Sequence, residues 1–439
     1  MCARASITVF DGGDNKPVID LGDRGSNVAK HSRLGNHMTN KLTLAQGRDY
    51  LAIPGPSVVP DAVLRAMHRA SPNIYHGALV DMTHGIIPDL KRVAGTAPDV
   101  VIYMCNGYGA WEAALSNVIA PGDKVLVPAT GSFGLGWGEM AAGLGARVQV
   151  LDFGKSSPMD MDRVAEVLGA DKAHEIKAVL GVHVDTSTSV RNDISALRRT
   201  MDAAGHPALL MADCVASMGC DRFEMDAWGV DVAVTASQKG LMMPPGLGFV
   251  FFNDKAARVR GAMPRVSRYW DWVPRADPDE FYQYFGGTAP THHLYGLRVA
   301  LDMIHAEGLT HVWARHERLA SAIWAACDIW GQGGPLAMNV ADRAHRSHAV
   351  TAVNIDPPMA TALRDWTETN LGLTLGISLG MAAPGDPAWH GHFRLGHMGY
   401  VNAHMILGLL GGIEAGLCAL DIPHGKGALE AAAVVIAGA

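Results

Sequence analysis

Seven short apolar segments alternate with helical patterns between residues 100 and 252, and this alternation constrains the fold more than any other feature of the chain. Short apolar segments between helical stretches are typical of strands that are buried on both faces of a sheet. Crossover helices join such strands, so we predict an α/β fold in which helices cover both faces of a mostly parallel, seven-stranded sheet. The segments read VVIYMC, KVLVP, RVQVLDF, KAVLGVHV, ALLMA, DVAVTA and GFVFF.

The last of these strands is expected to run in the opposite direction to the others. The sequence Pro-Pro-Gly at residues 244–246 stands just before GFVFF and leaves too few residues for a crossover helix. Between the other segments, the pattern predicts helices at residues 111–118, 136–144, 161–168 and 194–204.

Beyond residue 297 the helical and strand patterns combine differently, which indicates a smaller α+β domain. The pattern predicts two helices, a strand and a closing helix at residues 296–308, 312–330, 348–355 and 402–420.

The chain is therefore predicted to have four parts. Residues 61–297 form a large domain and residues 298–439 a small C-terminal domain, while residues 38–60 form an arm that passes over the functional site. Residues 1–37 are polar and rich in glycine, and they lack the apolar stretch of a signal peptide. We expect this segment to be disordered or a non-native extension.

Composition excludes several classes of partner. The chain has 439 residues, of which 49% are hydrophobic, and a formal net charge of −7 without clusters of lysine and arginine. This charge balance argues against binding to nucleic acid or to a membrane surface. The stretch Val401–Leu420 is apolar, but His404 and Glu414 interrupt it, so a packed helix is expected there instead of a membrane span. Six cysteines are scattered without CxxC spacing, as in a cytoplasmic protein with reduced thiols.

Two predicted strands end on chemically useful side chains. The segment ALLMA leads to Asp213, and DVAVTA leads to Lys239. Taken alone, each residue is ordinary, because acids at strand ends are often turn residues. Ligands of parallel sheets bind outside the carboxyl ends of the strands, so the two side chains are expected to meet there. A lysine forms a Schiff base with an aldehyde, and a carboxylate keeps a pyridine nitrogen protonated. The pair therefore points to pyridoxal 5'-phosphate as cofactor.

The sequence SQKGLMMPPGLGFVFF, preceded by MADCVASMG, resembles the cofactor-lysine region of class V aminotransferases, which have the fold-type I architecture. The likeness is greatest to the alanine/serine–glyoxylate aminotransferase group and to pyridoxamine–pyruvate aminotransferase, and it extends over residues 51–420. It implies a fold-type I transferase that uses pyridoxal phosphate and forms a homodimer with shared active sites.

The resemblance assigns catalytic and cofactor-binding roles. Lys239 matches the lysine that forms the Schiff base and moves the proton, and Asp213 matches the acid that pairs with the ring nitrogen. Ser237 and Gln238 flank the lysine and are expected to hydrogen-bond to the phosphate and the ring hydroxyl.

A glycine turn is expected to hold the phosphate. Gly107, Tyr108 and Gly109 lie between the first predicted strand and a helix, where the family has a similar turn. Backbone amides at a helix N-terminus bind anions.

Further matches place residues around the ring. Phe133 matches the aromatic that stacks on one ring face, and Val215 is expected against the other face. Thr186 and Ser187 lie in a segment that matches the loop covering the ring. Ser189 stands where that loop usually has glycine, so the loop geometry is expected to change if the glycine has a positive φ.

The substrate carboxylate is expected to bind Arg394. This residue lies in HFRLGHMG, which matches the family's RIGHxG segment, and a guanidinium binds a carboxylate in bidentate fashion. The nearby His390, His392 and His397 raise the alternative of a metal site, but no further ligand-spaced cluster supports it, so no metal is predicted.

Three other positions complete the predicted site. Thr288 matches the threonine that family members contribute to the partner's phosphate, although Gly286-Gly287 replaces the tyrosine that often precedes it. Gly55 belongs to the arm and is expected to approach the substrate closely. Tyr75 and His76 occupy the place where many glyoxylate-using relatives carry Asp-His-Arg.

The predicted function is that of a transaminase. It would move an amino group from a small amino acid, alanine or serine, to glyoxylate or pyruvate in a ping-pong cycle through the Lys239 Schiff base. Pyridoxamine–pyruvate transfer is the alternative. A lyase of the cysteine desulfurase type requires a mobile cysteine, whereas Cys327 and Cys418 fall within helical patterns. A non-catalytic binding protein is disfavoured because the lysine, the acid and the arginine are all present.

Overall fold

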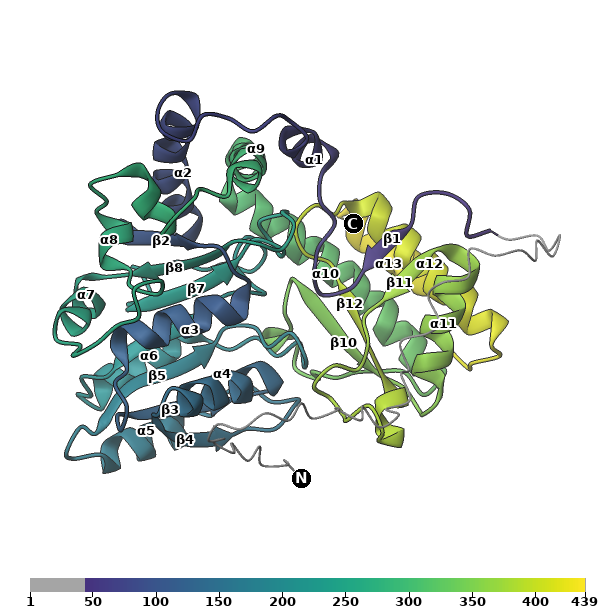
Figure 1. The fold of residues 1–439 in the computed structure, drawn as a ribbon. Helices are drawn as coiled ribbons and strands as arrows, with labels where there is room; N and C mark the ends of the chain where they lie inside the picture. Colours follow the sequence, from purple (N-terminus) through teal and green to yellow (C-terminus); the bar gives the residue numbers. More distant parts are fainter. Residues whose placement is uncertain (1–43, 439) are drawn as a thin grey trace, which may run out of the picture. The chain divides into compact units, whose positions relative to one another are not determined.

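The computed structural model describes residues 44–438, and the extension predicted at residues 1–37 lies outside the described residues. A seven-stranded sheet with the order β2-β8-β7-β6-β5-β3-β4 organises the large domain (Figure 1). The prediction of seven strands is confirmed, and so is the reversal after the Pro-Pro-Gly bend, because β8 pairs antiparallel with both of its neighbours. The strands are β2 (Asp99–Tyr103), β3 (Lys124–Ala129), β4 (Arg147–Asp152), β5 (Ile176–Val182), β6 (Leu209–Asp213), β7 (Val232–Ala236) and β8 (Gly248–Phe252).

Helices cover both faces of this sheet, as its buried strands require. Val100 packs into one hydrophobic cluster and the next residue, Val101, into another, since successive strand side chains point to opposite faces. The first cluster includes residues of α2 (Ala78–Ala94), α5 (Met161–Ala170), α6 (Ile194–Ala203) and α9 (Thr291–Glu307). The second includes residues of α3 (Gly107–Val118), α4 (Ser132–Gly143) and α7 (Asp254–Gly261).

Two helices begin earlier than the sequence pattern predicts. The structure starts α3 at Gly107 instead of residue 111, because the Asn106 side chain caps it. It starts α4 at Ser132 instead of residue 136. The carboxylate of Asp185, far away in the sequence, accepts hydrogen bonds from the first amides of α4.

The smaller C-terminal domain has its own sheets and hydrophobic core. Its three-stranded antiparallel sheet contains β9 (Ala337–Met338), β10 (Val350–Asn354) and β12 (His392–Gly396). A parallel pair joins β1 (Tyr50–Ala52) of the N-terminal arm to β11 (Leu373–Leu375). The helices are α10 (Leu309–Gln332), α11 (Met359–Leu371), α12 (Ala403–Ala419) and α13 (Ala428–Ala437).

The short helices are α1 (Asp61–Met67), α8 (Val273–Ala276), η1 (Phe281–Phe285), η2 (Arg343–His345) and η3 (Pro387–Gly391). The domain boundary predicted at residue 297 falls inside α9, so it stays a prediction. The domain boundary predicted at residue 60 stays a prediction too.

Across residues 44–438, no helix is long and apolar enough to cross a membrane.

Candidate active site

A cavity of about 230 Å³ opens where β6 and β7 end, next to the N-termini of α3 and α4. Its walls come from the large domain, the N-terminal arm and the small domain. Ten of the predicted site residues line it: Gly55, Gly107, Tyr108, Phe133, Thr186, Asp213, Val215, Gln238, Lys239 and Arg394. The cavity therefore gathers side chains that are separated by more than half of the sequence.

Lys239 follows β7 and is 9% exposed. Its Nζ donates a hydrogen bond to the carbonyl oxygen of Pro54 in the arm. Burial, together with the positive charge of Arg394, lowers the pKa of the lysine to about 8, while Asp213 opposes the shift. A larger share of this amine is uncharged at neutral pH than in an exposed lysine, and the uncharged amine is the nucleophile.

Asp213 is the last residue of β6, and 4% of it is exposed. The amide of Val215 donates to its Oδ1 at 2.8 Å. Burial raises the pKa of this carboxyl group to about 7, although the Val215 amide favours the ionised form. A cation placed beside the carboxylate would stabilise its ionised form. A protonated ring nitrogen would be such a cation.

The glycine turn forms the N-terminus of α3, as predicted. However, the side chain of Asn106 already accepts hydrogen bonds from the amides of Tyr108, at 3.1 Å, and Gly109, at 3.4 Å. The backbone of Gly107 passes close to Val215, since an added Cβ at Gly107 would lie 3.1 Å from Val215 Cγ2.

Asp185 connects the aromatic wall of the cavity to the loop at residues 183–192. Its buried carboxylate accepts hydrogen bonds from the amide of Phe133 at 2.9 Å and from the amide and hydroxyl of Ser187, at 2.9 and 2.5 Å. An added Cβ at Gly131 would lie 2.4 Å from Asp185 Cγ, so this position needs glycine. Asp185 thus fixes the backbone beside Phe133.

Ser189 adopts the left-handed conformation itself, with φ of 61°. Its hydroxyl accepts a hydrogen bond from the amide of Ala352 in β10, at 3.0 Å. The serine therefore does not force the loop into an extended conformation, and it links the loop to the small domain.

Arg394 lies in β12 and is 5% exposed. Its Nε donates to the carbonyl of Ile377 at 2.8 Å and its Nη1 to the carbonyl of Thr186 at 2.7 Å. Within the described part of the chain, Nη2 has no hydrogen-bond partner. Burial lowers the pKa of the guanidinium to about 10, and the charge of Asp185 opposes this shift. The side chain is held rigidly, with one nitrogen left for a ligand.

Comparisons with known proteins agree with the fold, with the cavity and with the residue types that line it. The family description "Aminotransferase class-V" matches residues 50–363. The chain belongs to this family. It is a pyridoxal-phosphate-dependent transaminase of fold type I.

Relatives of this aminotransferase are similar over nearly the whole chain. A serine–glyoxylate aminotransferase of Arabidopsis thaliana is 36% identical over 394 residues, covering 88% of this chain and 94% of the relative. An L-aspartate–glyoxylate aminotransferase of Paracoccus denitrificans is 36% identical over 389 residues, covering 87% and 94%. The crystal structure of pyridoxamine–pyruvate aminotransferase from Mesorhizobium loti has a TM-score of 0.81 at 25% identity, covering 90% of this chain and 100% of that one.

The residues present in this aminotransferase fit the cofactor. The cavity offers an acid for the ring nitrogen, a lysine for the aldehyde and a helix N-terminus for the phosphate. In addition, Oε1 of Gln238 is buried without a hydrogen-bond partner. A buried acceptor without a donor lowers the stability of the folded protein. The ring hydroxyl of the cofactor is a suitable donor for it.

Six predicted site residues do not line the cavity of the aminotransferase. The Ser237 hydroxyl donates to the carbonyl of Pro244 at 2.7 Å, so it stabilises the bend before β8. Ser187 and Gly109 donate hydrogen bonds to Asp185 and Asn106, respectively. The others, Thr288, Tyr75 and His76, are exposed. Their roles stay predictions.

Three residues that the sequence does not single out also line the cavity: Asn106, Trp111 and Leu379. Trp111 lies 4.8 Å from Tyr108 between ring centroids and extends the aromatic wall. The spacing of an aromatic after a glycine turn is a weak signal, because the same position suits a core residue. Leu379 comes from a loop of the small domain, which sequence patterns do not place.

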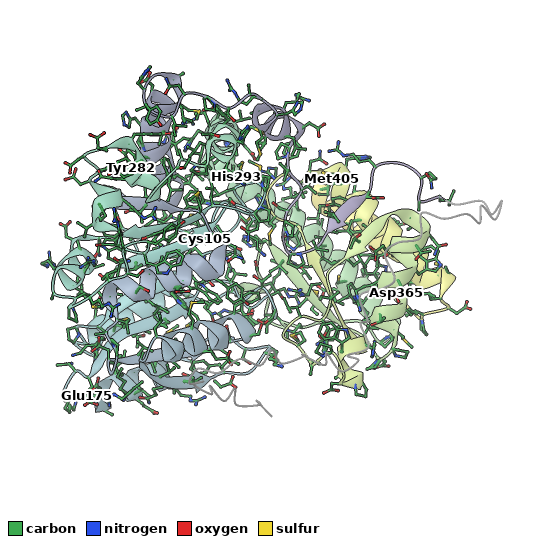
Figure 2. All side chains as sticks on the ribbon, in the orientation of Figure 1. Cys105, Glu175, Tyr282, His293, Asp365 and Met405 are labelled. Atoms are coloured by element: carbon green, nitrogen blue, oxygen red, sulfur yellow. The ribbon has the colours of Figure 1, made fainter. Side chains whose placement is uncertain are left out.

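The cysteines do not favour a lyase. No cysteine of residues 44–438 lines the cavity, and the nearest in sequence to the glycine turn, Cys105, follows β2 (Figure 2). Burial raises the pKa of the Cys105 thiol to about 12. Cys327 is buried in α10 and Cys418 lies in α12, as the sequence predicts. The cavity therefore lacks the cysteine nucleophile that such a lyase needs, as far as residues 44–438 show.

The histidines near Arg394 have separate partners. Nδ1 of His390 lies 2.8 Å from the Thr361 hydroxyl, and Nδ1 of His392 lies 2.9 Å from Oδ1 of Asn354. His397 is bonded to the Thr351 hydroxyl at 2.9 Å. The described residues contain no group of three or more potential metal ligands.

Proposed function

We propose that this transaminase moves the amino group of a small amino acid, alanine or serine, to glyoxylate or pyruvate. The observation that carries the proposal is that Lys239, Asp213 and Arg394 line one small cavity. Relatives with this architecture are named for transfer between serine or L-aspartate and glyoxylate. A donor half-reaction and an acceptor half-reaction then share the same site in a ping-pong cycle.

Pyridoxal phosphate supplies an electron sink that makes the Cα proton of a bound amino acid acidic. With the cofactor bound, Lys239 would be placed to take that proton, because its lowered pKa would give a usable base near neutral pH. The Pro54 carbonyl, which accepts from Nζ, holds the amine at the cavity wall. Asp213 would hold the ring nitrogen in its protonated form.

Arg394 is proposed to bind the carboxylate shared by amino acid and 2-oxo acid. Its Nε and Nη1 are fixed by two backbone carbonyls, which orients the plane of the guanidinium. The unpartnered Nη2 then donates to the substrate. Because the same group recognises both substrates, one arginine serves both half-reactions.

We also propose a homodimer with shared active sites. The support is that Thr288, which matches a residue lent to the partner's phosphate, is exposed outside the cavity of its own chain. Large aromatic side chains are exposed as well: Tyr75 is 83% exposed and Tyr282 (Figure 2) is 52% exposed. Exposed aromatics are enriched at protein interfaces.

Pyridoxamine–pyruvate transfer is the second candidate. It is supported by the similarity to the Mesorhizobium loti enzyme and by the lack of an Asp-His-Arg triplet at residues 75–77. In that case the pyridoxamine itself is the amino donor, and the same lysine and arginine act on it and on pyruvate.

Half-reactions followed by absorbance test the proposal. The purified yellow enzyme is mixed separately with L-alanine, L-serine, L-aspartate or pyridoxamine. We expect one of the first two to replace the absorbance of the lysine-bound cofactor with that of its amine form, and glyoxylate or pyruvate to reverse the change.

The variants Lys239→Ala and Arg394→Gln provide controls. Lys239→Ala should lose the lysine-bound absorbance, whereas Arg394→Gln should keep it but require much more donor. If pyridoxamine alone converts the enzyme, the second candidate replaces the first. If no donor produces the amine form, the proposal is refuted.

A further inference from the structure

Asn106 occupies the anion-binding end of α3. Its Oδ1 accepts from the amides of Tyr108 and Gly109, at 3.1 and 3.4 Å, and the residue lines the cavity. These are the same amides that a phosphate group at the glycine turn would use. An asparagine cap and a phosphate offer the same kind of oxygen to the same donors, so they exclude each other.

Few cationic groups near the cavity are available to an anion. Among the described residues that line it, the cationic side chains are Lys239 and Arg394. Lys239 donates to the Pro54 carbonyl, and Arg394 uses two of its nitrogens on backbone carbonyls. The Ser237 hydroxyl donates to the carbonyl of Pro244. Both cations therefore already have partners, and a phosphate at the glycine turn would rely on the amides of α3.

We propose that Asn106 sets the affinity of the site for the phosphate of the cofactor, by competing with it for the amides of Tyr108 and Gly109. The inference rests on the proposed cofactor site. A phosphorylated ligand must displace the carboxamide oxygen, whereas pyridoxal without phosphate leaves the cap in place. The competition reduces the affinity for the phosphorylated ring relative to the affinity for the phosphate-free ring. The site therefore also accepts phosphate-free pyridine aldehydes and amines.

Equilibrium binding to the full chain freed of cofactor tests the inference. The absorbance of the lysine-bound aldehyde reports the dissociation constants of pyridoxal phosphate and of pyridoxal. In Asn106→Ala we expect pyridoxal phosphate to bind about fivefold more tightly, because a capping interaction no longer competes. Pyridoxal should bind with unchanged affinity.

Asn106→Asp provides a variant that preserves folding, because aspartate caps helices as well as asparagine does. Its negative charge should weaken pyridoxal phosphate at least fivefold and leave pyridoxal nearly unaffected. Asp160→Ala is the matched control. Asp160 caps α5 through two amides, at 3.0 and 3.3 Å, away from the cavity. Its substitution should leave both dissociation constants unchanged.

The outcomes separate the alternatives. Weaker binding of pyridoxal phosphate to Asn106→Ala, with pyridoxal unchanged, would show that Asn106 donates to the phosphate and would overturn the inference. Equal changes for the two ligands, or no change for either, would overturn it too while leaving the proposed function intact. A wild-type chain that binds neither aldehyde would refute the proposed function and this inference with it.

Discussion

The carbonyl oxygen of Pro54 accepts a hydrogen bond from Nζ of Lys239, so the N-terminal arm reaches the lysine directly. Two more contacts hold the arm there. The Ser57 hydroxyl donates to the Lys239 carbonyl at 2.8 Å, and the Ser57 amide donates to the Gln238 carbonyl at 2.9 Å. The arm and the lysine loop are therefore positioned together, and a change in one should disturb the other.

Gly55→Ala tests this relationship. Gly55 has φ of 95°, and an added Cβ would lie 2.4 Å from Nζ of Lys239. We expect kcat to fall by roughly a hundredfold or more, because a small misplacement of a catalytic group has that effect. Gly122→Ala is the control, since Gly122 has φ of 91° with no atom within 4 Å of an added Cβ. Steady-state kinetics that show equal losses for both variants would contradict the role of the arm.

The sequence predicts the strands of the sheet well, since each buried apolar segment stands between turn residues. It predicts α13 poorly, because ALEAAAVVIA (residues 428–437) lacks a clear polar face. The starts of α3 and α4 depend on Asn106 and Asp185, and the second of these caps comes from a distant segment. A helical pattern cannot show such a contact.

The candidate site likewise contains residues that the sequence predicts and contacts that it does not predict. Asp213 and Lys239 are predictable because strand ends in a parallel sheet converge. The use of the Ser237 hydroxyl in the bend before β8 is not predictable, since a hydroxyl beside a lysine suits several partners equally well. The fixed guanidinium of Arg394 depends on carbonyls from two other loops, and only the folded chain brings these together.

The attachment of cofactor should depend on pH through Lys239. Its pKa is lowered to about 8 by burial and by Arg394, and the neutral amine is the reactive form. The rate of pyridoxal phosphate uptake should therefore rise as pH increases from 6 and level off above about 8. Arg394→Gln removes a nearby positive charge, so its inflection should lie at higher pH. Stopped-flow absorbance measures both, and a rate that is flat between pH 6 and 9 would contradict the prediction.

Ser189 should contribute to stability through its hydroxyl and cost stability through its backbone. Ser189→Ala leaves the Ala352 amide without a partner, which costs about 1–3 kcal/mol, and it keeps the left-handed conformation. Ser189→Gly loses the same bond but relieves about 1 kcal/mol of backbone strain. We expect the order of unfolding free energy to be wild type, then Gly, then Ala. Denaturant titration decides this, and an alanine variant as stable as the wild type would exclude a stabilising hydroxyl.

Asp221 should hold the large domain to the small domain. The side chain is fully buried, and its carboxylate accepts from the Ser347 hydroxyl at 3.0 Å and the His348 amide at 2.9 Å. Burial alone would raise the pKa of Asp221, but His348 and Arg191 lower it below its ordinary value. Asp221→Ala should therefore reduce the free energy of unfolding by about 3 kcal/mol at neutral pH.

The pH dependence of this loss follows from the direction of the pKa shift. A carboxyl group whose pKa is lower in the folded state stabilises the protein above its unfolded pKa, and the contribution disappears as pH falls through the folded value. The difference between Asp221→Ala and wild type should stay constant from pH 7 to 5 and shrink below about pH 4. Asp61→Asn is the control, since the Asp61–Arg48 pair is exposed and should contribute much less to stability than the buried acid does. Equal losses for the buried and the exposed acid would show that Asp221 does not join the domains.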